Sequence, residues 1–251
     1  MEYSLYIYLI LSIICLLIGF LGGFLGIALG AVRLPIIIIL GIEPIIAAST
    51  NLLAVIFGSF AGLIPAIKQN RVPIKASIRI AIPSMIAAFL GGYFAFQIPE
   101  LYLLIIMIFC LVVSGLVMTF YKISEFEDKP SNKNSLYEVI VGILISYFGG
   151  TVGLALGVLR VPAFVYFLRM NIKKAGGINL FLSILVGISA YAGHSFSGGF
   201  DYFLVLTIVF PTIIGMYCGS RFVTIANDNQ LRKILGITLL VLSLVLLIRE
   251  L

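Results

Sequence analysis

Long apolar segments follow one another along almost the whole chain of 251 residues. Stretches such as YSLYIYLILSIICLLIGFLGGFLG and IRIAIPSMIAAFLGGYFAF match or exceed the roughly 20 residues that an apolar helix needs to cross a bilayer. Only 10% of the residues are charged, against about 25% in a soluble domain. The sequence therefore predicts an all-α integral membrane protein, with residues 1–251 forming a single transmembrane domain. The start, MEYSLYIYLI, has no basic residue, which favours a first span over a cleaved signal peptide.

A phrase of 14 residues occurs twice. Residues 22–35 read GGFLGIALGAVRLP and residues 149–162 read GGTVGLALGVLRVP. The offset is 127 residues, from 22 to 149, and one inserted residue then changes it to 128, so that Asn51 aligns with Asn179 and Pro83 with Pro211. The chain therefore contains two copies of one structural unit. We assign repeat 1 to residues 1–121 and repeat 2 to residues 136–251, joined by a polar linker at 122–135.

The charges of equivalent loops indicate how the two copies cross the membrane. Residues 68–75, KQNRVPIK, are basic, whereas their counterpart SFSGGFDY at 196–203 has no basic residue. Conversely, RMNIKK at 169–174 is basic, while its counterpart GIEP at 41–44 carries only Glu43. Because lysine and arginine collect in cytoplasmic loops, equivalent loops are expected on opposite sides of the cell membrane. This pattern predicts two inverted repeats.

An inverted repeat requires an odd number of crossings, and about five fit each half. Both termini are then expected outside and the linker in the cytoplasm. Thirteen of the 16 basic residues fall in the cytoplasm or near that face, Arg249 lies outside, and only Arg33 and Arg160 remain in the apolar region of a crossing. The predicted crossings lie near residues 3–25, 27–41, 45–67, 76–97, 101–121, 137–152, 154–168, 175–194, 202–225 and 232–249.

Two of these crossings are too short to span as straight helices. Segments 27–41 and 154–168 would cover only ~22 Å of a ~30 Å hydrocarbon core. We expect the glycine-rich stretch to break the helix within the membrane, and a short helix to begin at Pro35 and at Pro162. Irregular backbone at that depth must be buried or line a wet cavity, and matching breaks in two halves point to the binding site of a transporter.

The glycines allow a second interpretation. Gly22, Gly26 and Gly30 are spaced four residues apart, as are their counterparts in the second half. They could form a stripe of small residues on a continuous helix that packs closely on a neighbour.

The two arginines within the crossings point to a negatively charged cargo. An intramembrane arginine costs at least ~2.5 kcal/mol and needs a partner. All acidic residues fall in or next to loops, so an anionic substrate is the expected partner of Arg33 and Arg160. The alternative is that each arginine reaches the interface or bonds to carbonyls freed by the break.

Three further polar residues lie in apolar runs. For Asn51 and Asn179 a hydrogen bond to another helix or to a break is favoured, with ligand contact as the alternative. For His194, the only histidine, a surface or capping role at the outer end of a span is favoured over a proton relay.

Other functional classes lack their signatures. There is no phosphate-binding loop for ATP, and neither HExxH nor GxSxG is present, so an enzyme is not expected. The cysteines occur singly, without a spacing typical of a metal site or disulfides. Basic residues in short loops indicate topology, so no nucleic acid, cofactor or metal is expected. The expected partners are a small anion and the lipid bilayer, and homodimerisation is left open.

The doubled segments GGFLGIALGAVRLPIIIILGIEPIIAASTNLLAVIFGSFAG and GGTVGLALGVLRVPAFVYFLRMNIKKAGGINLF resemble the sulfite exporter TauE/SafE family. The resemblance implies export of small sulfur-containing anions, such as sulfite or organosulfonates, across the cytoplasmic membrane. Two features differ from the family pattern: the glycine clusters are thinner, and the second half lacks the Ser49-Thr50 pair.

The leading hypothesis is a secondary transporter that works by alternating access. A passive anion channel, or an exporter of another small anion such as a carboxylate, is the alternative. The predicted substrate-binding residues are Gly22, Gly23, Gly26, Gly30, Arg33, Pro35, Thr50 and Asn51 in the first half, and Gly149, Gly150, Gly153, Gly157, Arg160, Pro162 and Asn179 in the second.

Overall fold

The computed structural model describes residues 5–95, 97–120, 135–154, 156–168, 171–195, 201–223 and 228–250. These residues form helices and no strand, which confirms the all-α class. Each predicted crossing coincides with one helix. The helices are α1 (Leu5–Leu25), α2 (Gly30–Ile39), α3 (Pro44–Lys68), α4 (Ile74–Ala95), α5 (Glu100–Phe120), α6 (Ser135–Thr151), α7 (Gly157–Leu168), α8 (Ile172–His194), α9 (Tyr202–Arg221) and α10 (Asp228–Glu250).

Within the part of the chain that the structure describes, six helices are long and apolar enough to cross a bilayer: α1, α3, α4, α5, α8 and α9. Shorter apolar helical stretches lie at Gly30–Ile39, Val139–Thr151 and Lys233–Ile248. Large apolar side chains are exposed along the outside of several long helices, among them Ile13, Phe60, Ile82, Phe109 and Phe210. Such a surface suits contact with lipid, so the chain is a multi-span membrane protein.

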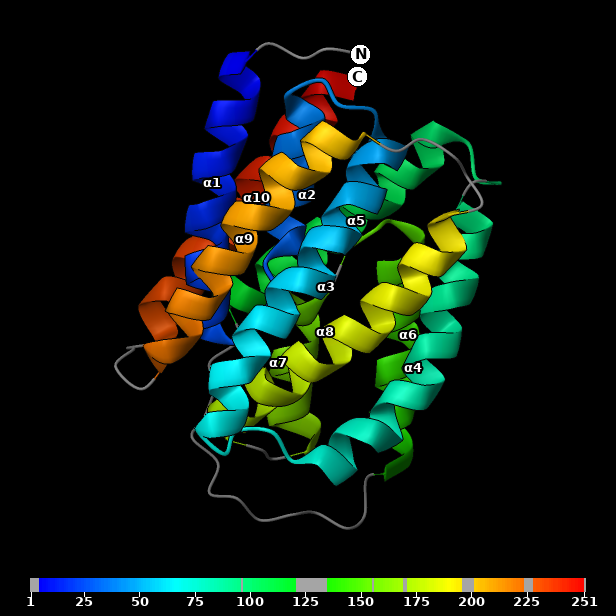
Figure 1. Ribbon diagram of the computed structural model, residues 1–251. Coiled ribbons are helices and arrows are strands. Elements are labelled where there is room, and N and C mark those ends of the chain that lie inside the picture. Colours follow the sequence, from blue (N-terminus) through cyan, green and yellow to red (C-terminus); the bar gives the residue numbers. More distant parts are fainter. Residues whose placement is uncertain are drawn as a thin grey trace.

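The two halves interdigitate. The main packing partner of α1 is α9 of the second half, and that of α6 is α4 of the first half. Helix α3 packs on α9 and α8, while α5 packs on α10. Figure 1 shows α1 starting at the end of the bundle where α10 finishes, whereas α6 starts at the opposite end, so α1 and α6 run in opposite directions. Every main contact surface therefore joins elements from both halves.

Glycines permit two equivalent close helix contacts. A Cβ atom on Gly23 of α1 would lie 2.3 Å from the Met216 carbonyl oxygen of α9, and one on Gly150 of α6 would lie 2.4 Å from the Ala88 oxygen of α4. The predicted close packing by small residues is therefore correct for the glycines that lie within α1 and α6. The continuous-helix interpretation is nevertheless wrong, because α1 ends at Leu25 and the chain is not helical again until Gly30.

The short helices begin earlier than predicted. Helix α2 starts at Gly30 and α7 at Gly157, so Pro35 and Pro162 lie inside their helices and not at the first position. The reason is local: the Leu29 carbonyl accepts hydrogen bonds from the N–H groups of both Val32 and Arg33, which forms the first turn upstream of the proline. The proline then removes a single backbone bond without stopping the helix.

Candidate functional site

The two helix breaks have the same backbone geometry. Gly26 has φ +68° and Gly153 has φ +68°, a left-handed conformation that glycine adopts without penalty. After each turn the chain folds back on the preceding helix: the Ile27 N–H donates to the Gly22 oxygen at 2.9 Å, and the Leu154 N–H donates to the Gly149 oxygen at 2.8 Å. The repeated phrase thus encodes one repeated backbone structure.

Each break is held by an asparagine of the other half. The Asn51 side-chain amide donates to the Gly153 oxygen at 2.8 Å, and the Asn179 amide donates to the Gly26 oxygen at 3.2 Å. Both asparagines are fully buried. The predicted hydrogen bond from asparagine to a break is therefore confirmed, and it links the two halves. An unpaired carbonyl within an apolar bundle is costly, so these bonds stabilise the irregular backbone.

The break glycines also face the opposite half at close range. A Cβ on Gly26 would lie 2.8 Å from the Cα of Gly176 in α8, and one on Gly153 would lie 2.4 Å from the Cβ of Ala48 in α3. Only glycine combines this backbone angle with this contact. The two breaks, α3 and α8 thus form one joint structure.

Arg33 is buried, with hydrogen-bond partners from both halves. Its Nε donates to the Asn51 side-chain oxygen at 2.9 Å, and one terminal nitrogen donates to the Thr212 hydroxyl at 2.7 Å. Arg33 is thus neither at the interface nor bonded to a break carbonyl, and its polar neighbours are neutral.

Arg160 occupies the equivalent position in α7 and is equally buried, at 1% exposure. In contrast to Arg33, none of its three guanidinium nitrogens has a hydrogen-bond partner among the described residues. A buried polar group without a partner is rare in a native fold, and a charged one is costlier still. This guanidinium is the strongest sign of a ligand in the described part of the chain.

The other predicted residues surround the same structure. The Asn51 side chain lies against Gly30, and the Asn179 side chain lies against Gly157. A Cβ atom added to these glycines would lie only 2.9 Å and 2.6 Å, respectively, from the asparagine amide nitrogens. Pro35, Thr50 and Pro162 are buried. The carbonyl oxygens of Gly22 and Gly149 accept hydrogen bonds from the chain after each break, whereas Gly23 and Gly150 pack on neighbouring helices.

The favoured surface role of His194 is wrong. Its ring is 2% exposed, and Nε2 lies 2.8 Å from the Gly150 oxygen. Gly193 and His194, at the end of α8, are buried because glycines let α4, α6 and α8 approach closely: a Cβ on Gly193 would lie 2.6 Å from the Phe89 oxygen. His194 therefore ties α8 to the glycine-rich end of α6.

Sequence reasoning missed Thr212, the hydroxyl partner of Arg33. The repeat offers a signal for it, because Thr212 follows Pro211 just as Ser84 follows the aligned Pro83. A hydroxyl thus occurs at the same place in α9 and α4. Among the described residues, no group of three or more histidine, cysteine or acidic side chains could hold a metal ion.

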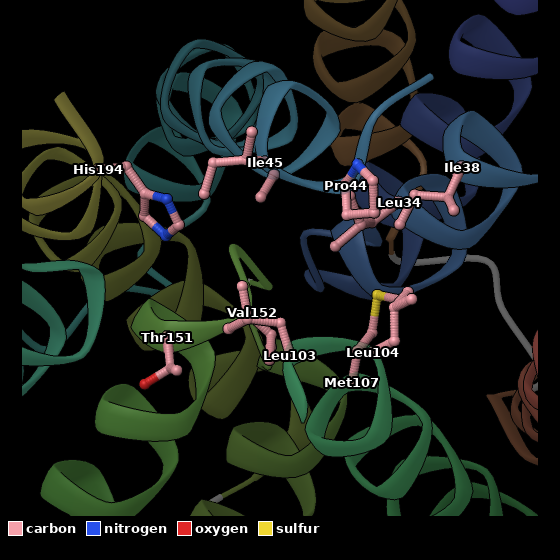
Figure 2. Close-up of a pocket in the computed structure, with 11 residues that line it drawn as sticks. Leu34, Ile38, Pro44, Ile45, Leu103, Leu104, Met107, Thr151, Val152 and His194 are labelled. Carbon is pink, nitrogen blue, oxygen red and sulfur yellow. The ribbon is translucent and has the colours of Figure 1, made fainter. Parts of the chain in front are cut away.

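A mainly apolar cleft reaches the second break. Figure 2 shows His194, Thr151 and Val152 on one side of it, with Leu34, Ile38 and Met107 opposite. Val152 directly precedes Gly153. A separate, smaller cavity includes Arg33, Ser59 and Thr212 in its lining. Both halves therefore have internal space next to their breaks.

A multi-span helical bundle with two matched helix breaks and two buried arginines has the architecture of a membrane transporter. The chain belongs to the sulfite exporter TauE/SafE family, whose sequence model, "Sulfite exporter TauE/SafE", matches residues 11–246.

The curated relatives agree with this class. The chain is 24% identical to "Probable membrane transporter protein ORF9" of Sinorhizobium sp, over 87% of this chain and 84% of that protein. It is 21% identical to "Probable membrane transporter protein YdhB" of Bacillus subtilis, over 96% and 99% of the two chains. It is also 24% identical to YunE of Bacillus subtilis, over 95% of each. No solved structure gives a significant match.

Proposed function

We propose that this protein is a secondary transporter that exports small sulfur-containing anions, of the sulfite or organosulfonate class, across the cell membrane. The observation that carries the proposal is the buried Arg160 guanidinium, which has no partner among the described residues. A cation held inside an apolar bundle needs hydrogen-bond acceptors or a counter-charge. A bound anion would supply both to Arg160.

The protein itself offers no such counter-charge in its described part. The buried polar side chains of those residues include arginine, asparagine, serine, threonine and histidine but no carboxylate. The partial positive charge at the start of α7, which begins at Gly157, would add to the attraction for an anion. Negative cargo therefore suits this site better than a cation or a neutral molecule.

The proposed mechanism is alternating access by two inverted repeats. The loop charges and the opposite directions of α1 and α6 (Figure 1) support halves that are inverted in the membrane, with both termini outside. The asparagine bonds across the halves would hold the breaks together as the bundles rock around them. The apolar cleft beside Val152 would serve as one access route.

Flux in reconstituted vesicles tests this proposal. We expect efflux of sulfite to saturate with concentration and to show counterflow, because a transporter must bind its cargo in each cycle. Linear flux without counterflow would indicate a channel. Faster exchange of a carboxylate than of sulfite would change the substrate class. Arg160→Ala should abolish the sulfite flux, and unchanged flux in both Arg33→Ala and Arg160→Ala would refute the role of the arginines.

A further inference from the structure

The surroundings of the two arginines can be compared position by position. In the first half, Arg33 is bonded to Asn51 and Thr212. By the offset of 128 residues, the repeat equivalents of Asn51 and Thr212 are Asn179 and Ser84. The repeat thus matches each arginine with a side-chain amide of its own half and a hydroxyl of the other half.

The groups matched with Arg160 do not bond to one another. All three Arg160 nitrogens, the Asn179 side-chain oxygen and the Ser84 hydroxyl lack hydrogen-bond partners among the described residues. Ser84 is 1% exposed and Asn179 is fully buried, so water from outside does not satisfy them. The arrangement that is closed around Arg33 is open around Arg160.

Two more hydroxyls distinguish the second half. Gly19 and Val55 line the cavity beside Arg33, and the equivalent positions are Ser146 and Ser183. Both serines are fully buried, and both hydroxyls lack partners among the described residues. The first-half cavity has a single comparable group, Ser59, whose counterpart is Gly187.

The helix packing supports placing these serines together. A Cβ on Gly142 of α6 would lie 2.8 Å from the Ser84 hydroxyl oxygen, so this hydroxyl is directed at α6. Ser146 follows Gly142 by one helical turn, and Ser183 follows Asn179 by one turn of α8. Helix α4 packs on both α6 and α8. The repeat relation and the contacts thus lead to the same cluster.

We propose that the anion site is one-sided: Arg160, Ser84, Ser146 and Ser183 of the Arg160 cluster bind one small oxyanion, whereas Arg33 is a positioning residue. This inference rests on the proposed function and specifies its site. The hydroxyls and the terminal guanidinium nitrogens donate to the oxygens of the anion. When the anion binds, the Asn179 side-chain oxygen would accept from the Arg160 Nε, as the Asn51 oxygen accepts from the Arg33 Nε, and so orient the guanidinium. The structure does not contain this bond.

Thermal unfolding of the purified protein in detergent separates the two arginines, with and without sulfite at equal ionic strength. In the wild type, sulfite at a large excess over its Kd should raise Tm by roughly 5 °C. Without sulfite, Arg160→Met should raise Tm or leave it unchanged, because it removes an unpaired buried charge. Arg33→Met should lower Tm, because it breaks two buried hydrogen bonds.

The rise in Tm that sulfite causes should show the opposite pattern, with Arg160→Met the affected variant. Arg160→Met should lose the sulfite-induced rise in Tm. Arg33→Met should show the same rise as the wild type, although its Tm without sulfite is lower. Loss of the rise in Arg33→Met alone would overturn the one-sided site and leave the proposed transport intact. A wild type that responds to neither sulfite, sulfate nor a sulfonate, and moves none of them in vesicles, would refute the proposed function itself.

Serine variants keep the inference testable if an arginine variant does not fold. Ser146→Gly and Ser183→Val give the second half the residues found at the equivalent first-half positions. Each should raise the Kd for sulfite about tenfold, as expected for a hydrogen bond to a charged group. Ser59→Ala is the matched control, a buried hydroxyl next to the other arginine, and should leave the Kd unchanged. Equal effects of Ser59→Ala and Ser146→Gly would contradict the proposal.

Discussion

The two halves of this protein share a backbone structure and differ in what surrounds their arginines. The Gly26 and Gly153 breaks have the same φ, and each is bonded by the asparagine of the other half. Arg33 nevertheless has partners within the protein, and Arg160 has none among the described residues. The comparison shows that a duplicated motif can form the same backbone structure twice. The side chains around each copy then determine whether its arginine is bonded within the protein or available to a ligand.

The largest loss of stability, and the largest difference between the halves, is expected when the break glycines Gly153 and Gly26 are replaced by alanine. Gly153→Ala forces a left-handed φ on alanine and brings its Cβ to 2.4 Å from that of Ala48. Strain and overpacking together should destabilise the fold by about 2–5 kcal/mol. Gly26→Ala should cost less, because its Cβ would meet the Cα of Gly176 at 2.8 Å. Melting temperature in detergent would rank the two variants.

Gly41 provides the control for backbone strain alone. Its φ is +91°, and a Cβ there would meet nothing within 4 Å. Gly41→Ala should therefore cost only about 1 kcal/mol. Equal melting temperatures for Gly41→Ala and Gly153→Ala would show that the contact between the second break and α3 is unimportant.

The second largest difference in stability is expected between alanine variants of the two asparagines. Asn51 donates to the Gly153 oxygen and accepts from Arg33, so Asn51→Ala leaves two buried groups unpaired and should cost about 2–4 kcal/mol. Asn179 makes one bond, at 3.2 Å to the Gly26 oxygen, so Asn179→Ala should cost about 1 kcal/mol. Denaturation of the two variants side by side measures this difference. A greater loss in Asn179→Ala would mean that the second half is the more tightly bonded one.

Sequence reasoning reached the repeated scaffold because glycine, proline and asparagine act on the backbone locally. It predicted the helix breaks, the short helices and the role of Asn51 and Asn179. The start of α2 at Gly30 was not predicted, since it depends on the Leu29 carbonyl accepting two bonds. The burial of His194 and the pairing of Arg33 with Thr212 depend on packing between distant helices, which a linear pattern does not contain.

His194 gives the smallest expected effect. The equivalent residue in the first half is Ala66, so the bond from His194 to the Gly150 oxygen has no counterpart there. His194→Phe should cost about 1 kcal/mol through loss of that bond and leave sulfite flux intact. His194→Gln, which can still donate, should be closer to wild type. A sharp fall of flux in His194→Gln would indicate a proton relay instead.

Side-specific labelling tests the central claim, that the two halves cross the membrane in opposite directions. Glu43 and Asn171 are equivalent residues, both exposed and both preceding the first turn of their helices, α3 and α8. With the three native cysteines replaced, Glu43→Cys should react with an impermeant maleimide in intact cells. Asn171→Cys should react only after the membrane is opened. Labelling of both positions from the same side would contradict the account.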